Sequence, residues 1–119
     1  MINEDLIINK FLKPLSKNFK ESLNLSDDAA ILKLSNNKNF IVSVDNFIYG
    51  IHCPNSINIS HAVKRAILIA MSDLSAMAAK PYCIFLSVTL KKNINLRVLK
   101  DLKIGIKKAL DQTDTNLAG

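Results

Sequence analysis

The sequence predicts an α+β domain in which helices cover one face of a mixed β-sheet. Three features indicate this class: two short apolar runs joined by a polar turn, a long helical segment rich in Ala and Ile, and a charged helix with one apolar stripe. With 119 residues, 49% of them hydrophobic and only three Gly and three Pro, the chain is long enough for one domain with one core.

The first half of the chain predicts one helix and one hairpin. Apolar residues at helical spacing favour a helix over Asp5–Leu15, and the polar stretch Ser16–Asn24 follows it. Ala29–Leu34 and Phe40–Asp45 have the composition of strands, and Ser35–Asn39 has that of a turn. A turn this short makes the two strands an antiparallel hairpin.

The second half predicts a helix, a strand and a second helix. Asn46–Ile59 has no clear period and reads as a loop or an irregular strand. Ser60–Ala79 is strongly helical, with Ser60 as its N-cap. Tyr82–Leu90 alternates apolar residues on both sides, which predicts a strand buried on both faces. Leu96–Asp111 is an amphipathic helix. Its apolar stripe consists of Leu99, Leu102, Ile106 and Leu110.

Composition excludes several classes of protein. The net charge of +6 could attract nucleic acid, but no DNA- or RNA-binding motif accompanies it, so we expect no nucleic-acid partner. The longest apolar stretches, Ala66–Met71 and Tyr82–Leu90, are too short to span a membrane. Acids near the N-terminus argue against an export signal. Cys53 and Cys83 form neither a zinc pattern nor a disulfide framework, so we expect a cytoplasmic protein.

Four carboxylates occupy positions where the local pattern disfavours charge. Asp27 and Asp28 precede the first strand, Asp45 closes the second, and Asp73 lies inside an apolar helical run. A buried carboxylate needs a cation, several N–H donors or a metal ion. We therefore expect each of these acids to lie near a cation, a set of N–H donors or a metal ion.

The hairpin brings some of these acids together. Pairing Leu34 with Phe40 across the turn places Asp28 and Ala29 beside Asp45, although a slip of one residue leaves open whether Asp27 or Asp28 faces the site. Ser43 shares a strand face with Asp45. Carboxylates with a hydroxyl form a hard oxygen cluster that suits Mg²⁺ rather than zinc.

Each acid also has a purely structural interpretation. Asp27 or Asp28 could be a turn residue that binds nearby backbone N–H groups. Asp73 could cap a second short helix after a break near Met71. Asp45 could simply begin a turn. These alternatives stay open at this point.

Three further side chains have plain interpretations. His52 lies on the loop after the hairpin, where a histidine is usually solvated. Cys53 has no base at motif spacing and is expected to be a small buried hydrophobe. His61 is expected on the surface of the first turn of a helix. No glycine-rich phosphate loop of the Walker A or GxGxxG type occurs in the sequence.

Three ordered segments together resemble the N-terminal half of the thiamine-monophosphate kinase family. They are SDDAAIL (26–32), VSVDNFIYGIHCP (42–54) and SDLSAMAAKP (72–81). The family belongs to the aminoimidazole-ribonucleotide-synthetase-like superfamily. The resemblance implies an α+β N-terminal domain that dimerises through its sheet. It also implies Mg²⁺-assisted, direct in-line transfer of the ATP γ-phosphoryl group to thiamine monophosphate, giving thiamine diphosphate.

The resemblance also implies a set of metal ligands. Asp28 matches the metal-binding second acid of the family's Asp-Asp pair, and Ser43 and Asp45 match ligands at the end of the second strand. Asp73 matches the aspartate that bridges several Mg²⁺ ions. Val44 stands where the family has a Thr whose oxygen helps bind metal, so that contact is weakened or falls to the backbone.

The remaining matches concern the substrates. His52 matches a residue that contacts thiamine phosphate. Gly119 matches the first Gly of a Gly-Gly-Asp element that touches nucleotide and metal. Ala78 replaces a Gly of the family pattern, and Tyr49 replaces a frequent Glu.

The resemblance further implies that residues 1–119 are the N-terminal ATP/Mg-binding and dimerisation domain of a kinase, cut before a C-terminal domain. Thr115–Gly119 starts an apolar run and stops, as expected of such a cut. We therefore expect the chain alone to be inactive. The rivals are another ATP-using member of the superfamily, such as selenophosphate synthetase, and a degenerate module that binds or dimerises without catalysis.

Overall fold

The computed structural model describes residues 5, 8–9, 13–16, 20–26, 30–33 and 38–119. It divides the chain into two compact units, Met1–Val44 and Asp45–Gly119, which are described separately. The sequence predicted one core, and the core cluster given below lies within the second unit.

The first unit contains the predicted antiparallel hairpin. Strand β1 spans Ala30–Lys33, and the two outermost residues of the expected strand, 29 and 34, lie outside the described residues. Strand β2 spans Asn39–Val42, so it ends three residues before the expected Asp45. The register pairs Leu32 with Phe40, which corrects the expected pairing of Phe40 with Leu34. Because side chains alternate with a period of two, this shift of two residues changes the partners but keeps each side chain on its face.

The described residues Asp5, Ile8 and Asn9 are helical, as predicted for the helix over Asp5–Leu15. The end of this segment is wound differently from the prediction. Its described part contains the 3₁₀ helix η2 at Lys13–Ser16, and Pro14 is tolerated there because early helical N–H groups need no partner. A second 3₁₀ helix, η3, spans Lys20–Leu25, within a stretch that was expected to be merely polar.

Helix α2 spans Ile59–Ala76 in the second unit. Its N-cap is Asn58 rather than Ser60: the Asn58 side-chain oxygen accepts a hydrogen bond of 2.8 Å from the Ser60 N–H. The helix stops three residues before the predicted end, where Ala78 takes a left-handed φ of 52°. The N–H of Ala79 then bonds to the Leu74 carbonyl at 2.9 Å, which closes a Schellman motif.

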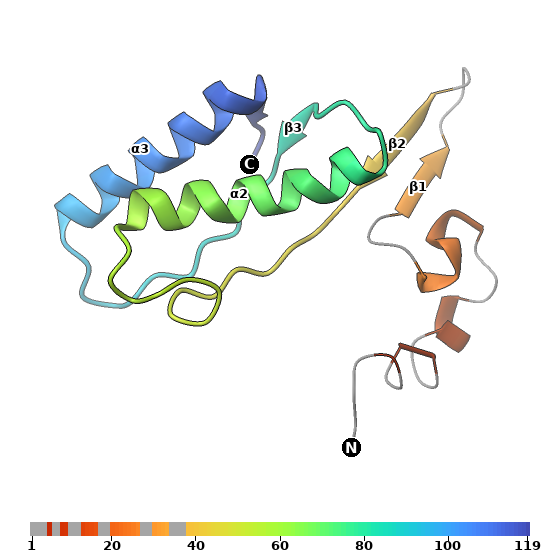
Figure 1. Cartoon of the computed structure of the whole chain (residues 1–119), viewed down its shortest axis with the longest axis horizontal. Helices are drawn as coiled ribbons and strands as arrows, with labels where there is room; N and C mark the ends of the chain where they lie inside the picture. The colour runs from red at the N-terminus through yellow and green to blue at the C-terminus, as the bar shows by residue number, and fades with distance from the viewer. Residues whose placement is uncertain (1–4, 6–7, 10–12, 17–19, 27–29, 34–37) are drawn as a thin grey trace. The chain divides into compact units, whose positions relative to one another are not determined.

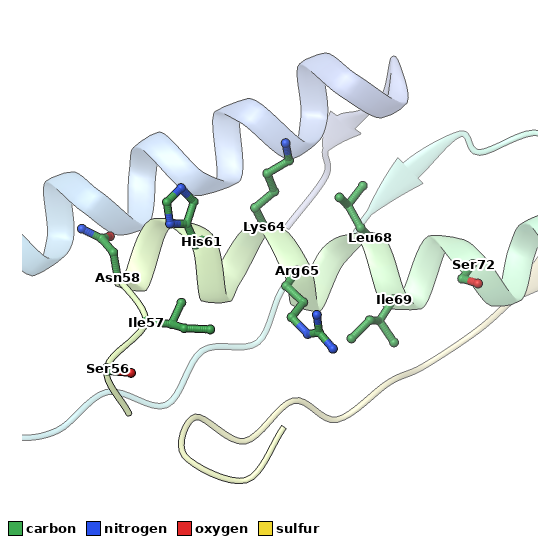
Figure 2. Close-up of a pocket in the computed structure, with 9 residues that line it drawn as sticks. All are labelled: Ser56, Ile57, Asn58, His61, Lys64, Arg65, Leu68, Ile69 and Ser72. Carbon is green, nitrogen blue, oxygen red and sulfur yellow. The ribbon is translucent and has the colours of Figure 1, made fainter. Parts of the chain in front are cut away.

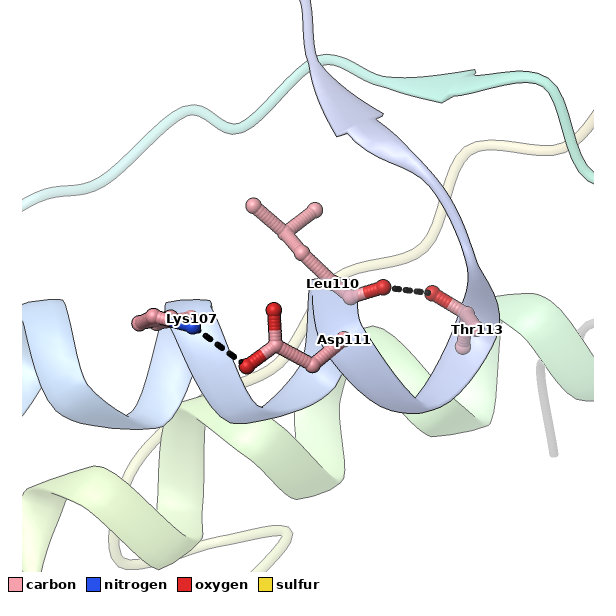
Figure 3. A network of polar contacts seen from close by, with 4 residues as sticks. All are labelled: Lys107, Leu110, Asp111 and Thr113. Carbon is pink, nitrogen blue, oxygen red and sulfur yellow. Dashed lines mark hydrogen bonds and ion pairs between the residues drawn. The ribbon is translucent and has the colours of Figure 1, made fainter.

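Helix α3 spans Leu96–Thr113, close to its expected bounds. The Asn95 side chain caps it by accepting a bond of 3.0 Å from the Val98 N–H. At the other end, the Thr113 hydroxyl donates to the Ala109 carbonyl oxygen at 2.8 Å. It also donates to the Leu110 carbonyl oxygen at 3.5 Å (Figure 3), so carbonyls of the last turn gain a donor.

The core of the second unit forms where α2 and α3 pack side by side (Figure 1). Its buried members are Val63, Ile67, Met71 and Ala109. Leu102 and Ile106, two of the predicted stripe residues, pack against this cluster. No helix within the described residues has the length and apolar character that crossing a membrane requires.

The predicted strand Tyr82–Leu90 is largely absent. Only Cys83–Ile84 forms a strand, β3, which pairs in parallel with β4 at Asn116–Leu117. Tyr82 and Phe85 are 76% and 77% exposed, so the strand is not buried on both faces. The described partner strand is only two residues long, so most backbone groups of this segment gain no ladder partner from it.

The α+β class is confirmed, and the sheet arrangement needs correction. The described residues form two separate two-stranded sheets, one antiparallel and one parallel, in place of a single mixed sheet. Within the second unit, Ile84 of β3 and the adjacent Leu86 pack against the cluster to which both helices contribute.

Candidate metal and substrate sites

The predicted metal ligands are distributed over both units of the chain. Asp28 lies outside the described residues. Ser43 and Val44 end the first unit, and Asp45 begins the second. Asp73 lies on α2. Among the described residues, no group of three or more His, Cys, Asp or Glu side chains is gathered as a metal centre would require.

The segment after β2 offers oxygen ligands in irregular backbone. Because β2 ends at Val42, Ser43 and Asp45 do not share the face of a regular strand as expected. Ser43 is half-buried and Asp45 is exposed. The Val44 side chain is 90% exposed and carries no oxygen, so this residue can offer a metal ion only its backbone carbonyl.

Asp73 lies within a continuous helix. Helix α2 runs through Met71 and Asp73 to Ala76, so the interpretation of Asp73 as the cap of a second short helix was wrong. The half-buried carboxylate belongs to the last turn, where the helix dipole is negative, and that turn contains no basic residue. An acid there is electrostatically disfavoured unless a cation lies nearby. The hydroxyl of Ser43 and the carboxylates of Asp45 and Asp73 are hard oxygen donors, which fit Mg²⁺ chemically.

His52 is held by a tight turn of the loop between β2 and α2. The backbone N–H of Ile48 donates to His52 Nδ1 at 2.7 Å, and the His52 N–H donates to the Ile48 carbonyl at 2.9 Å. The Phe47 ring lies beside the imidazole, with centroids 5.6 Å apart and planes tilted by 37°. The residue is exposed, as expected, but its ring is anchored and not simply solvated.

The same loop is closed by a tyrosine and a glycine. The Tyr49 hydroxyl donates to the carbonyl oxygens of Asn55, at 2.8 Å, and Ile57. Gly50 has a φ of 89°, and a Cβ atom there would lie 2.5 Å from Asn55 Oδ1. The turn therefore requires glycine at this position.

Gly119 lies beside β3. Its carbonyl oxygen accepts a hydrogen bond of 2.8 Å from the Leu86 N–H. A Cβ atom on Gly119 would lie 3.0 Å from the Phe85 ring, so a larger residue would require the ring to move. This contact extends the parallel pairing of β3 with β4 to the last residue of the chain.

Two plain interpretations are confirmed. Cys53 is 5% exposed and lies in the loop as a small buried hydrophobe. His61 is exposed in the first turn of α2.

A pocket of about 790 Å³ lies along α2 and the segment that precedes it (Figure 2). Its lining residues are Ser56, Ile57, Asn58, His61, Lys64, Arg65, Leu68, Ile69 and Ser72. Lys64 and Arg65 extend in opposite directions, and the apolar side chains of Leu68 and Ile69 lie next along the helix (Figure 2). Sequence reasoning missed this pocket, although the spacing of its residues at three, four and seven positions after His61 marks one helix face. It contains none of the predicted metal or substrate residues.

Comparison with known proteins identifies relatives over most of the chain. Residues 26–119 match the family described as "AIR synthase related protein, N-terminal domain". A thiamine-monophosphate kinase of Buchnera aphidicola subsp. Schizaphis graminum is 33% identical over 98% of this chain and 36% of its own length. The thiamine-monophosphate kinase of Synechococcus elongatus is 34% identical over 91% of this chain and 33% of its own length. The resemblance drawn from the three motifs is thereby confirmed.

The matched region is a part of each relative. The chain spans about a third of the length of these two curated relatives. The Escherichia coli K12 thiamine-monophosphate kinase matches over a shorter stretch, with 29% identity over 71% of this chain. No solved structure matches the chain significantly.

Proposed function

Because the chain belongs to the AIR synthase related protein family, we propose that it is the N-terminal, Mg²⁺- and ATP-binding part of a cytoplasmic thiamine-monophosphate kinase. The observation that carries this proposal is the match to thiamine-monophosphate kinases over as much as 98% of the chain. The three motif segments lie within that match, and Asp45, His52 and Asp73 are all present.

The proposed reaction is a direct phosphoryl transfer. A phosphate oxygen of thiamine monophosphate forms a new P–O bond to the γ-phosphorus of ATP while the bond to the ADP oxygen breaks, giving thiamine diphosphate and ADP. Such transfers need positioning and neutralisation of charge rather than covalent chemistry by the protein. Mg²⁺, when bound, supplies that neutralisation.

The residues of this chain divide those tasks. Asp28, Asp45 and Asp73, with the Ser43 hydroxyl and the Val44 carbonyl, would hold Mg²⁺. His52 would contact the phosphate of thiamine monophosphate. Gly119 would lie at the nucleotide. We further propose that two copies of the domain pair through their sheets, a view consistent with the exposed Tyr82 and Phe85 beside β3.

A chimera tests the proposal. This chain replaces the corresponding third of the Buchnera relative, since their alignment covers 98% of the chain and defines the junction. We expect thiamine diphosphate to form from ATP and thiamine monophosphate. Asp45→Asn should abolish turnover. Asp101→Asn on α3, outside all three motifs, should leave it intact. The 119-residue chain by itself should form no product.

A degenerate, non-catalytic module is the second candidate. It is favoured by the exposed, oxygen-free Val44 side chain at a position where the resemblance implies a metal-binding Thr. A chimera that folds and binds thiamine monophosphate but forms no thiamine diphosphate supports this alternative and contradicts the kinase.

A further inference from the structure

The contacts around His52 determine which of its ring nitrogens carries hydrogen. A backbone N–H can only donate, so the nitrogen that it meets must have a free lone pair. That nitrogen is Nδ1, which lies 2.7 Å from the Ile48 nitrogen. In the neutral ring the hydrogen therefore resides on Nε2.

The turn that supplies this N–H is itself fixed at its base. Tyr49 follows Ile48 directly, and its hydroxyl bonds to the backbone oxygens of Asn55 and Ile57. Ile57 precedes Asn58, the N-cap of α2, so the phenol ties the His52 turn to the start of a long helix. Loss of this hydroxyl removes two hydrogen bonds at the base of the loop and leaves the Ile48 N–H, which bonds to the imidazole, in place.

We propose that Tyr49 is a positioning residue that, together with the Ile48 N–H, presents Nε2–H of His52 as a fixed hydrogen-bond donor to a phosphate oxygen of a bound ligand. The inference rests on the proposed function for the ligand, thiamine monophosphate, and for the contact of its phosphate with His52. It gives His52 the role of a donor that orients the phosphate, and it excludes a role for this residue as the base that removes a proton.

The first test needs no ligand. Long-range ¹H–¹⁵N spectra of the chain are recorded at about pH 8, above the usual titration range of imidazole. We expect a single tautomer with hydrogen on Nε2. Tyr49→Phe should move both nitrogen signals toward the average of two tautomers. Tyr82→Phe is the matched control, because Tyr82 lies outside the loop and is mostly exposed. Hydrogen on Nδ1 would contradict the donor role of Nε2. Unchanged nitrogen signals in Tyr49→Phe would contradict the positioning role of Tyr49.

The second test asks whether Nε2 is the nitrogen that meets phosphate. The amide nitrogen of Gln reaches roughly the position of Nε2, and that of Asn roughly the position of Nδ1. Thiamine monophosphate and, separately, inorganic phosphate are titrated into the native chain while the same spectra are recorded. Calorimetry measures the affinities of the native chain and of the two His52 variants, because the variants lack the imidazole. We expect His52→Gln to retain affinity within about fivefold. His52→Asn should lose about tenfold or more, as for a lost hydrogen bond to a charged group. Equal loss in both variants contradicts the donor role.

The two proposals fail in different ways. If inorganic phosphate shifts the Nε2 signal and thiamine monophosphate does not bind, the donor role stands and the proposed substrate is wrong. If neither compound shifts the Nε2 signal, the donor role is wrong even where the tautomer is as expected.

Discussion

Gly105 of α3 lies so close to Ser60 of α2 that a Cβ atom on Gly105 would be 2.2 Å from the Ser60 carbonyl oxygen and 2.7 Å from its Cα. Both neighbouring atoms are backbone, so a change of rotamer cannot relieve the contact. The approach of α3 to the first turn of α2 therefore depends on the absence of a side chain at one position. That turn follows directly from the loop that carries His52.

Gly105→Ala is expected to destabilise the chain. Alanine favours a helix by up to about 1 kcal/mol over glycine, but overpacking of this kind costs about 1–3 kcal/mol and here forces two helices apart. We expect the overpacking to dominate and the melting temperature to fall by several degrees. Lys103→Ala, an exposed substitution on the same helix, should change the free energy of unfolding by less than about 0.5 kcal/mol. A more stable Gly105→Ala variant would contradict the close approach.

Ala78→Gly is expected to stabilise the chain. Ala78 has a φ of 52° at the Schellman end of α2, a conformation that costs a residue with a Cβ atom roughly 1–2 kcal/mol. The greater freedom of glycine in the unfolded chain offsets part of this, so we expect a net gain of about 0.5–1 kcal/mol. Ala70→Gly, inside the same helix, should instead lose about 1 kcal/mol. If denaturant titrations show that Ala78→Gly and Ala70→Gly change the free energy of unfolding in the same direction, the assigned end of α2 is wrong.

The ion pair of Lys107 with Asp111 should contribute little. Lys107 Nζ and Asp111 Oδ2 are 2.6 Å apart (Figure 3). Both side chains are exposed, however, and Asp111 lies near the negative end of the helix. A double-mutant cycle with Lys107→Ala and Asp111→Ala should give a coupling of at most about 0.5 kcal/mol, lower still at 1 M salt. A coupling energy above about 1 kcal/mol would contradict the solvent exposure that the structure gives both side chains.

Local signals in the sequence predicted the helices well. The apolar period predicted α3 almost to its ends, because periodicity acts within a few residues, whereas the Asn95 cap was not foreseen. The end of α2 was missed because Ala78 adopts a backbone conformation that its residue type disfavours, so no Gly marks it. Gly105 was not recognised as a packing residue, because its role depends on a helix that is distant in sequence.

The strands and the site were less predictable. Tyr82–Leu90 has strand composition, but a strand needs partners, and pairing with the described residues 116–119 supports only its first part. The pairing of Phe40 with Leu32 depends on how the turn closes, which composition does not determine. The motif indicated His52 as a candidate substrate-binding residue. The hydrogen bond from the Ile48 N–H to its Nδ1 is a backbone contact that no residue pattern reveals.

The most direct measurement of the central claim is the melting temperature of the chain as Mg²⁺ is titrated. An ion that binds only the folded state stabilises it by about 1.4 kcal/mol at ten times its dissociation constant, which corresponds to a rise of several degrees. We predict this rise for the native chain and for Asp101→Asn, and its loss in Asp45→Asn and Asp73→Asn. A melting temperature that does not change up to millimolar Mg²⁺, or one that rises equally in all four proteins, would contradict a metal site built from these acids.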